Sequence, residues 1–146
     1  MRPQQFIQAE TTSRLGLIQA LGRMPTLTDL SANQSAPYAI LAASFAKAIA
    51  FGDFETAHSY LSSSIRNEMP QDQLCLIYGE LISYWGGPAT HVEVMATMDE
   101  WPARQPLDLG WAYVEIHGQG YCEAVAVVVG QESGMPVIRE IEWGRP

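Results

Sequence analysis

The hydrophobic pattern of the chain changes its period once, close to Pro88. Before this point apolar residues recur at the three- and four-residue spacing of helices, and after it they alternate with polar residues as in strands. Helices that precede strands in this way indicate an α+β domain with helices over an antiparallel sheet. The sequence therefore predicts three helices on one face of a curved four-stranded antiparallel sheet, preceded by an N-terminal helical arm.

Three segments before Pro88 carry strong helical patterns. Residues 38–51 are small and apolar with a single charge, which predicts a helix buried on most sides. Residues 53–67 follow a glycine and carry one apolar stripe, and residues 69–87 begin with a proline in the first turn and end at two glycines. Residues 4–23 have a looser helical pattern, so residues 1–36 are predicted to form a helical arm and its connector.

Four runs after Pro88 have the alternation of strands. They comprise residues 90–101, 110–118, 121–131 and 136–144, and the segments between them contain turn residues. No internal repeat or second domain is evident. Residues 37–146 are therefore predicted to form one α+β domain whose inner surface can hold a cavity.

The charge balance argues against nucleic acid as a partner. The chain has 8 basic and 16 acidic residues, for a net charge of −8, and its basic residues are scattered. Phosphate backbones are bound through clustered positive charge, which is missing here. An acidic surface suits solubility and, where it contacts a protein, a basic partner.

Hydropathy and cysteine content predict a cytoplasmic protein. No stretch approaches the roughly 20 apolar residues of a membrane span, and the N-terminus lacks the apolar run of a signal peptide. The two cysteines, Cys75 and Cys122, have apolar neighbours and no CxxC spacing, which favours buried reduced thiols. A disulfide between them remains geometrically possible.

The order of these segments is similar to that of a known superfamily. The similarity lies in the helical segment "FAKAIAFGDFETAHSYLSSSIRNEMPQDQL" and in the strands from "THVEVMATMDEW" to "PVIREIEWG". This pattern, over roughly residues 37–143, resembles the nuclear transport factor 2-like, cystatin-like α+β cone superfamily. The resemblance implies one of several roles: isomerase-like or dehydratase-like enzymes, polyketide cyclases, adaptors, and bacterial immunity proteins that neutralise toxins. Fold alone does not choose among them.

One histidine in the helical part is a candidate for catalysis. His58 lies at the edge of the apolar stripe of residues 53–67, and a histidine near its ordinary pKa can move protons at neutral pH. It can equally be a histidine at the rim of a helix. Asp53 and Glu55 have a simpler role, because a cap and a first-turn carboxylate both stabilise a helix start.

The second strand has the densest polar and aromatic pattern in the chain. Alternation places Trp111, Tyr113, Glu115 and His117 on one face, opposite Ala112, Val114 and Ile116. The favoured interpretation turns Val114 and Ile116 to the core and the polar face outward. A three-residue turn would pair Glu115 with Glu123, whereas a two-residue turn would pair Glu115 with a small residue.

A surface of aromatic and acidic side chains is typical of protein interfaces. The same alternation in the first strand assigns Val92, Val94, Ala96 and Met98 to the core and His91, Glu93, Met95, Thr97 and Asp99 to the other face. The predicted binding residues are Trp101, Trp111, Tyr113, Glu115, His117, Tyr121 and Glu123.

Sequence motifs predict neither a metal nor a cofactor. The histidines at 58, 91 and 117 have no HxxxH or HxH spacing that would place two of them on one face. The chain also has no GxSxG elbow and no phosphate-binding loop.

The leading hypothesis is therefore a small non-enzymatic binding domain, of the immunity type or an adaptor, with a protein partner. The alternative is an isomerase, dehydratase or cyclase in which His58 is the acid or base and Tyr84, Tyr113 or Glu115 polarises a substrate oxygen. A third possibility is a homodimer formed through the sheet.

Overall fold

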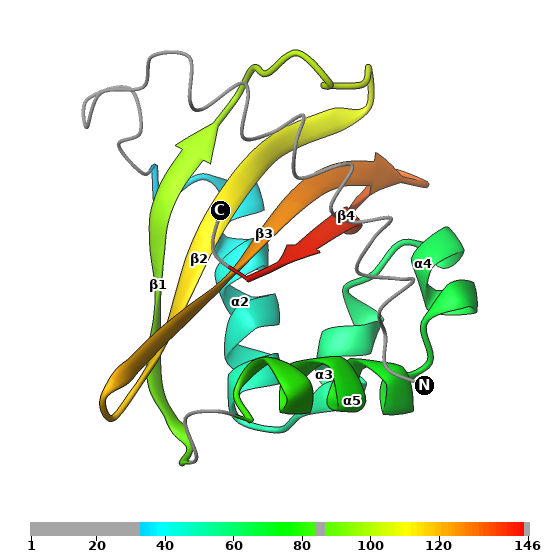
Figure 1. The fold of residues 1–146 in the computed structure, drawn as a ribbon. Helices are drawn as coiled ribbons and strands as arrows, with labels where there is room; N and C mark the ends of the chain where they lie inside the picture. The colour runs from blue at the N-terminus through cyan, green and yellow to red at the C-terminus, as the bar shows by residue number, and fades with distance from the viewer. Residues whose placement is uncertain (1–32, 84–86, 145–146) are drawn as a thin grey trace.

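The computed structural model describes residues 33–83 and 87–144. Four helices come first, α2 (Pro37–Ala50), α3 (Phe54–Ser59), α4 (Ser63–Glu68) and α5 (Gln71–Leu81). Four strands follow, β1 (Ala89–Met98), β2 (Asp108–Gly118), β3 (Tyr121–Glu132) and β4 (Met135–Trp143). The strands pair antiparallel in chain order, and the helices lie on one side of the sheet (Figure 1). The predicted α+β fold is confirmed, whereas the arm predicted for residues 1–36 lies outside the described residues as far as residue 32.

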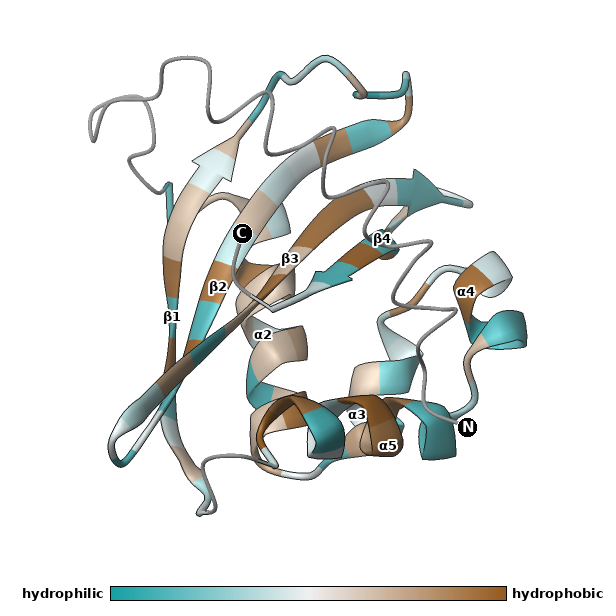
Figure 2. Cartoon of the chain, viewed as in Figure 1, coloured by the Kyte–Doolittle hydropathy of each residue, from teal (hydrophilic) through white to brown (hydrophobic). Residues whose placement is uncertain are grey.

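Helix α2 connects the helical layer to the sheet. It contacts all four strands, and α3 and α5 pack against it. Ala39, Ala42 and Ala46 are fully buried, so the helix axis approaches the sheet closely. Larger side chains fill the space that remains, and Phe45 packs on Trp143 with ring centroids 6.4 Å apart. In Figure 2 most of the ribbon of α2 has hydrophobic colours, and hydrophobic and hydrophilic bands alternate along β1 and β2.

The helix predicted for residues 53–67 is two short helices. Asp53 caps α3 by accepting from Thr56 N at 3.2 Å, as predicted. The chain then leaves the helix, because Leu61 forms a parallel bridge with Ile138 of β4. Ser62 restarts the helical path, and its hydroxyl accepts a hydrogen bond from the backbone of the first turn of α4. The apolar stripe was correct, but a backbone contact with the sheet interrupts the helix.

A bulge in β1 corrects the predicted alternation of that strand. The register shifts between Val94 and Ala96, so Met95 has no partner of its own in β2. Beyond the bulge Ala96 and Met98 pack with Trp111, on the face opposite the helices. The prediction placed both residues in the main core because it assumed an unbroken alternation along β1.

The cysteines differ from expectation in their exposure. Cys75 is exposed on α5, and Cys122 is half-buried on β3. Neither forms a disulfide. The predicted burial is therefore wrong for Cys75, because the apolar stripe of α5 runs through Leu74 and Ile77 instead. In the described part of the chain no helix has the length and apolarity needed to cross a membrane.

Gly110 provides the space for Tyr38, the first buried side chain of α2. A Cβ at residue 110 would lie 2.4 Å from the ring of Tyr38, whose hydroxyl donates to Asp99 Oδ1 at 2.8 Å. Burial and this hydrogen bond raise the pKa of Tyr38 above its usual value.

We expect Gly110→Ala to lower the free energy of unfolding by about 1–3 kcal/mol, because the ring of Tyr38 must move to admit the methyl group. Urea unfolding measures this cost. Gly79→Ala is the control for the added methyl group, since nothing lies within 4 Å of a Cβ at that helical position. Equal stability of the Gly110→Ala variant and the wild type would contradict the close contact.

Candidate functional site on the outer face of the sheet

The outer face of the sheet, defined here as the face opposite the helices, carries the polar side of β2. Val114 and Ile116 are fully buried in the core, so the favoured interpretation of this strand is confirmed. The β2–β3 turn has two residues, because Gly118 pairs with Tyr121. Glu115 therefore pairs with Ala124 and not with Glu123.

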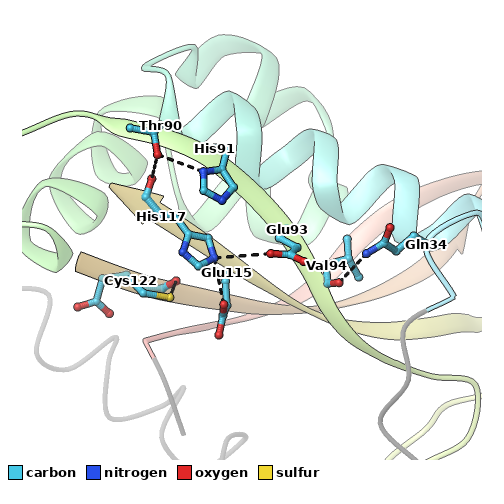
Figure 3. A network of polar contacts seen from close by, with 9 residues as sticks. Gln34, Thr90, His91, Glu93, Val94, Glu115, His117 and Cys122 are labelled. Carbon is cyan, nitrogen blue, oxygen red and sulfur yellow. Dashed lines mark hydrogen bonds and ion pairs between the residues drawn. The ribbon is translucent and has the colours of Figure 1, made fainter. Parts of the chain in front are cut away.

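Two histidines and two glutamates from neighbouring strands meet on this face. We call His91, Glu93, Glu115 and His117 the His–Glu cluster (Figure 3). In the sheet His91 is the partner of His117, and Glu93 is the partner of Glu115. The two imidazole rings stack with centroids 4.5 Å apart and an angle of 3° between their planes. His117 Nε2 lies 3.1 Å from Glu115 Oε1 and 4.0 Å from Glu93 Oε1. Both carboxylates thus approach one ring nitrogen.

Thr90 fixes the orientation of the His91 ring. Its hydroxyl donates to the carbonyl oxygen of His117 at 3.1 Å and lies 3.1 Å from His91 Nδ1. A hydroxyl has one proton, and a carbonyl can only accept, so the hydroxyl accepts from His91 Nδ1–H. The neutral ring then has its lone pair on Nε2.

The cluster and the neighbouring Cys122 of β3 contain two groups of side chains with the composition of a metal site. His91, Glu93 and His117 form one group, and Glu115, His117 and Cys122 form the other. Within each group the possible ligand atoms lie within 4.8 Å of one another. The prediction of no metal site considered only histidine spacing along one strand. Pairing between strands brings together two histidines that the sequence separates.

The predicted aromatic contacts are less accessible than expected. Trp111 is 2% exposed and Trp101 is 7% exposed, and both belong to a small second apolar cluster with Val128 on the outer face. Tyr113 is half-buried and stacks on Trp111. The expectation that these tryptophans present exposed anchors is therefore wrong.

The remaining predicted binding residues lie on the other side of the sheet. Tyr121 and Glu123 alternate with Cys122, so they face the helical layer. Tyr121 is buried, and its hydroxyl donates to the carbonyl oxygen of Gly87 at 3.1 Å. Of the predicted binding set, Tyr113, Glu115 and His117 share the outer face and keep part of their surface in contact with solvent.

The described residues among those predicted for catalysis do not converge. His58 lies in the last turn of α3 in the helical layer, and its Nε2 atom is buried. Glu115 and Tyr113 lie on the outer face, so the sheet separates them from His58. Tyr84 lies outside the described residues.

The two edges of the sheet differ. The edge at β4 is covered in part by residues 60–62, since Ser62 N donates to Ile138 O and Ile138 N donates to Tyr60 O, each at 2.8 Å. In the described part of the chain β1 pairs with β2 alone. On its free side the carbonyl oxygen of Val94 accepts from the side chain of Gln34 at 3.0 Å.

A groove follows this free edge of β1. Its volume is about 320 Å³, and it lies between the edge and the exposed side of α2. Ile40 on its wall is 54% exposed, and Glu93 of the His–Glu cluster lies at the same groove. Its wall is completed by Gln34, Ala43, Ser44, Lys47, Val92 and Val94. The free edge and the His–Glu cluster are thus adjacent.

Comparisons of the chain with protein-family models, with curated proteins and with solved structures found no match. The resemblance to the nuclear transport factor 2-like superfamily therefore stays a prediction from the sequence pattern.

Proposed function

We propose that the chain is a non-enzymatic binding domain that holds a protein partner along the free edge of β1. The observation that carries the proposal is the difference between the two edges of the sheet. An unpaired edge presents backbone N–H and C=O groups that accept an added strand from a partner. At β4 residues 60–62 take this role beside Ile138, whereas β1, which pairs with β2 alone among the described residues, borders a groove with an exposed apolar wall.

The charge of the domain favours a basic partner. The chain has a net charge of −8. At the groove itself the half-exposed carboxylate of Glu93 is offset by Lys47, so the preference for a basic partner comes from the net charge of the whole chain. Acidic groups around a contact surface attract a basic protein and accelerate association. Among the roles that the superfamily resemblance implies, a bacterial immunity protein that occludes a basic toxin, or an adaptor, suits this surface. The proposal includes a cytoplasmic location.

The experiment uses a basic protein encoded beside the gene for this chain as the partner. We expect Ile40→Lys to weaken its binding by at least tenfold in titration calorimetry, because the change adds a positive charge to the apolar wall of the groove. Both Ile40 and the control residue Leu76 are more than half exposed, so neither lysine variant should affect folding.

Leu76→Lys introduces the same side chain on α5 and should change the dissociation constant by less than twofold. Equal losses in the two variants would exclude the groove as the contact surface. Failure of the wild-type chain to bind any basic neighbour would remove the proposed function itself.

The homodimer predicted from the sequence is tested with the same variants. Sedimentation velocity at micromolar concentration separates monomer from dimer. A dimer that Ile40→Lys dissociates would assign the free edge to a second copy of the chain, in place of a different protein.

A further inference from the structure

We propose that the His–Glu cluster is a binding site for one divalent transition-metal ion of the zinc class. The proposal concerns the outer face of the sheet and does not depend on a protein partner. Imidazole nitrogens and carboxylate oxygens are ordinary zinc ligands, and the imidazoles favour such ions over magnesium or calcium. His91, Glu93, Glu115 and His117 supply two of each.

The positions of these side chains are close to those of bound ligands. Four ligands held tetrahedrally at zinc distances lie roughly 3.3–3.7 Å from one another. His117 Nε2 is already 3.1 Å from Glu115 Oε1 and 4.0 Å from Glu93 Oε1, and the ligand atoms of His91, Glu93 and His117 lie within 4.8 Å of one another. Glu115 groups with His117 and not with His91, and the two imidazole rings stack in parallel, so the His91 ring must turn out of the stack before both rings can bind one ion. These side-chain rotations complete the site without movement of the strands.

The pairing of like residues also points to a cation. Glu93 stands directly opposite Glu115, and carboxylates in directly opposed strand positions repel each other. The neighbouring pair places His91 directly opposite His117. A divalent cation between the four side chains offsets the repulsion of the two carboxylates and makes the opposed pairs shared ligands.

Thr90 acts as an orienting residue for the site. Histidine ligands are held by a hydrogen bond to the ring nitrogen that does not bind the metal. The Thr90 hydroxyl occupies this position at His91 Nδ1, and it leaves Nε2 available. The β1–β2 register shifts between Ala89 and His91, so Thr90 lies in a bulge directly beside the His91 ligand.

The test is calorimetric titration of Zn²⁺ into the full chain after dialysis against a chelator. We expect one ion per chain. His117→Ala should weaken binding at least a hundredfold, because this residue belongs to both groups of possible ligands. Glu93→Gln, which keeps the side-chain shape, should weaken binding by about tenfold or more.

Two controls keep the result specific. His58→Gln removes the histidine on the far side of the sheet and should leave the affinity within twofold. Cys122→Ser should leave it within threefold, and a loss of binding in this variant would overturn the assignment to the four residues. Thermal unfolding without metal checks that each variant is folded.

The proposal fails if the folded wild-type chain binds no Zn²⁺ at millimolar concentration. It also fails if His117→Ala binds as tightly as the wild type. Neither result bears on the free edge of β1, whose test uses a protein partner and the Ile40→Lys variant.

Discussion

A Phe45→Ala variant should unfold with a free energy about 3–5 kcal/mol below that of the wild type. Phe45 is fully buried where α2 faces the sheet, and its ring packs on Trp143 of β4. Alanine would lose the contacts of the ring and leave a cavity that the rigid sheet cannot close. Because domains are stable by about 5–15 kcal/mol, this loss is a large part of the total. The midpoint of urea unfolding measures it.

The matched control is Phe51→Ala, which removes the same ring immediately after α2. Phe51 is 55% exposed, so its loss should cost less than about 1 kcal/mol. Similar costs for the two variants would mean that Phe45 does not join the helices to the sheet as described.

An Arg139→Met variant should be destabilised by about 3–5 kcal/mol, because it leaves the buried carboxylate of Asp108 without its charged partner, with only the backbone N–H of Gln105, among the described residues, still donating to it. Arg139 donates from Nε and Nη2 to the two carboxylate oxygens of Asp108, each at 2.7 Å. The Asp108 side chain is 1% exposed, and this pairing raises the pKa of Arg139. The contact links β2 to β4 over Gly130, where a Cβ would lie 3.2 Å from Asp108 Oδ1.

The double variant Asp108→Asn, Arg139→Met separates the effect of the charge pair from the effect of the two side chains on packing. It removes both charges, so it should be more stable than Arg139→Met alone. A single variant that costs less than 1 kcal/mol, or a double variant that costs the sum of both changes, would contradict the account of a buried pair. Thermal and urea unfolding at neutral pH provide the comparison.

Local patterns predicted the fold class because the two halves of the chain differ in period. Helix α2 begins at Pro37, and the four strands follow one another in chain order. Both features depend on turn residues and on alternation, which are local properties of the sequence. The break between α3 and α4 cannot be predicted from such local patterns. It arises from the bridge of Leu61 to Ile138, a contact between residues far apart in the chain. Met95 likewise gives no local signal of the bulge that shifts Ala96 and Met98 to the outer face.

The candidate site was found in part. Alternation predicted that Glu115 and His117 lie on the outward face of β2. It did not predict that these residues contact His91 and Glu93 of β1. The signal was present as mirrored triplets, "HVE" at 91–93 and "EIH" at 115–117. Antiparallel pairing superimposes mirrored triplets only in one register. That register depends on residues 99–107, a long connection whose sequence does not determine it.

The central claim, that a partner docks along the free edge of β1, is tested most directly by amide hydrogen exchange of the free and bound chain. The carbonyl oxygen of Val94 points away from β2, and in an antiparallel strand the N–H of the same residue points the same way. Val92, two residues earlier, shares this direction. We predict that binding of the basic partner slows exchange of the Val92 and Val94 amides at least tenfold. Unchanged exchange at these two amides in a saturated complex, with protection elsewhere on the domain, would contradict the account.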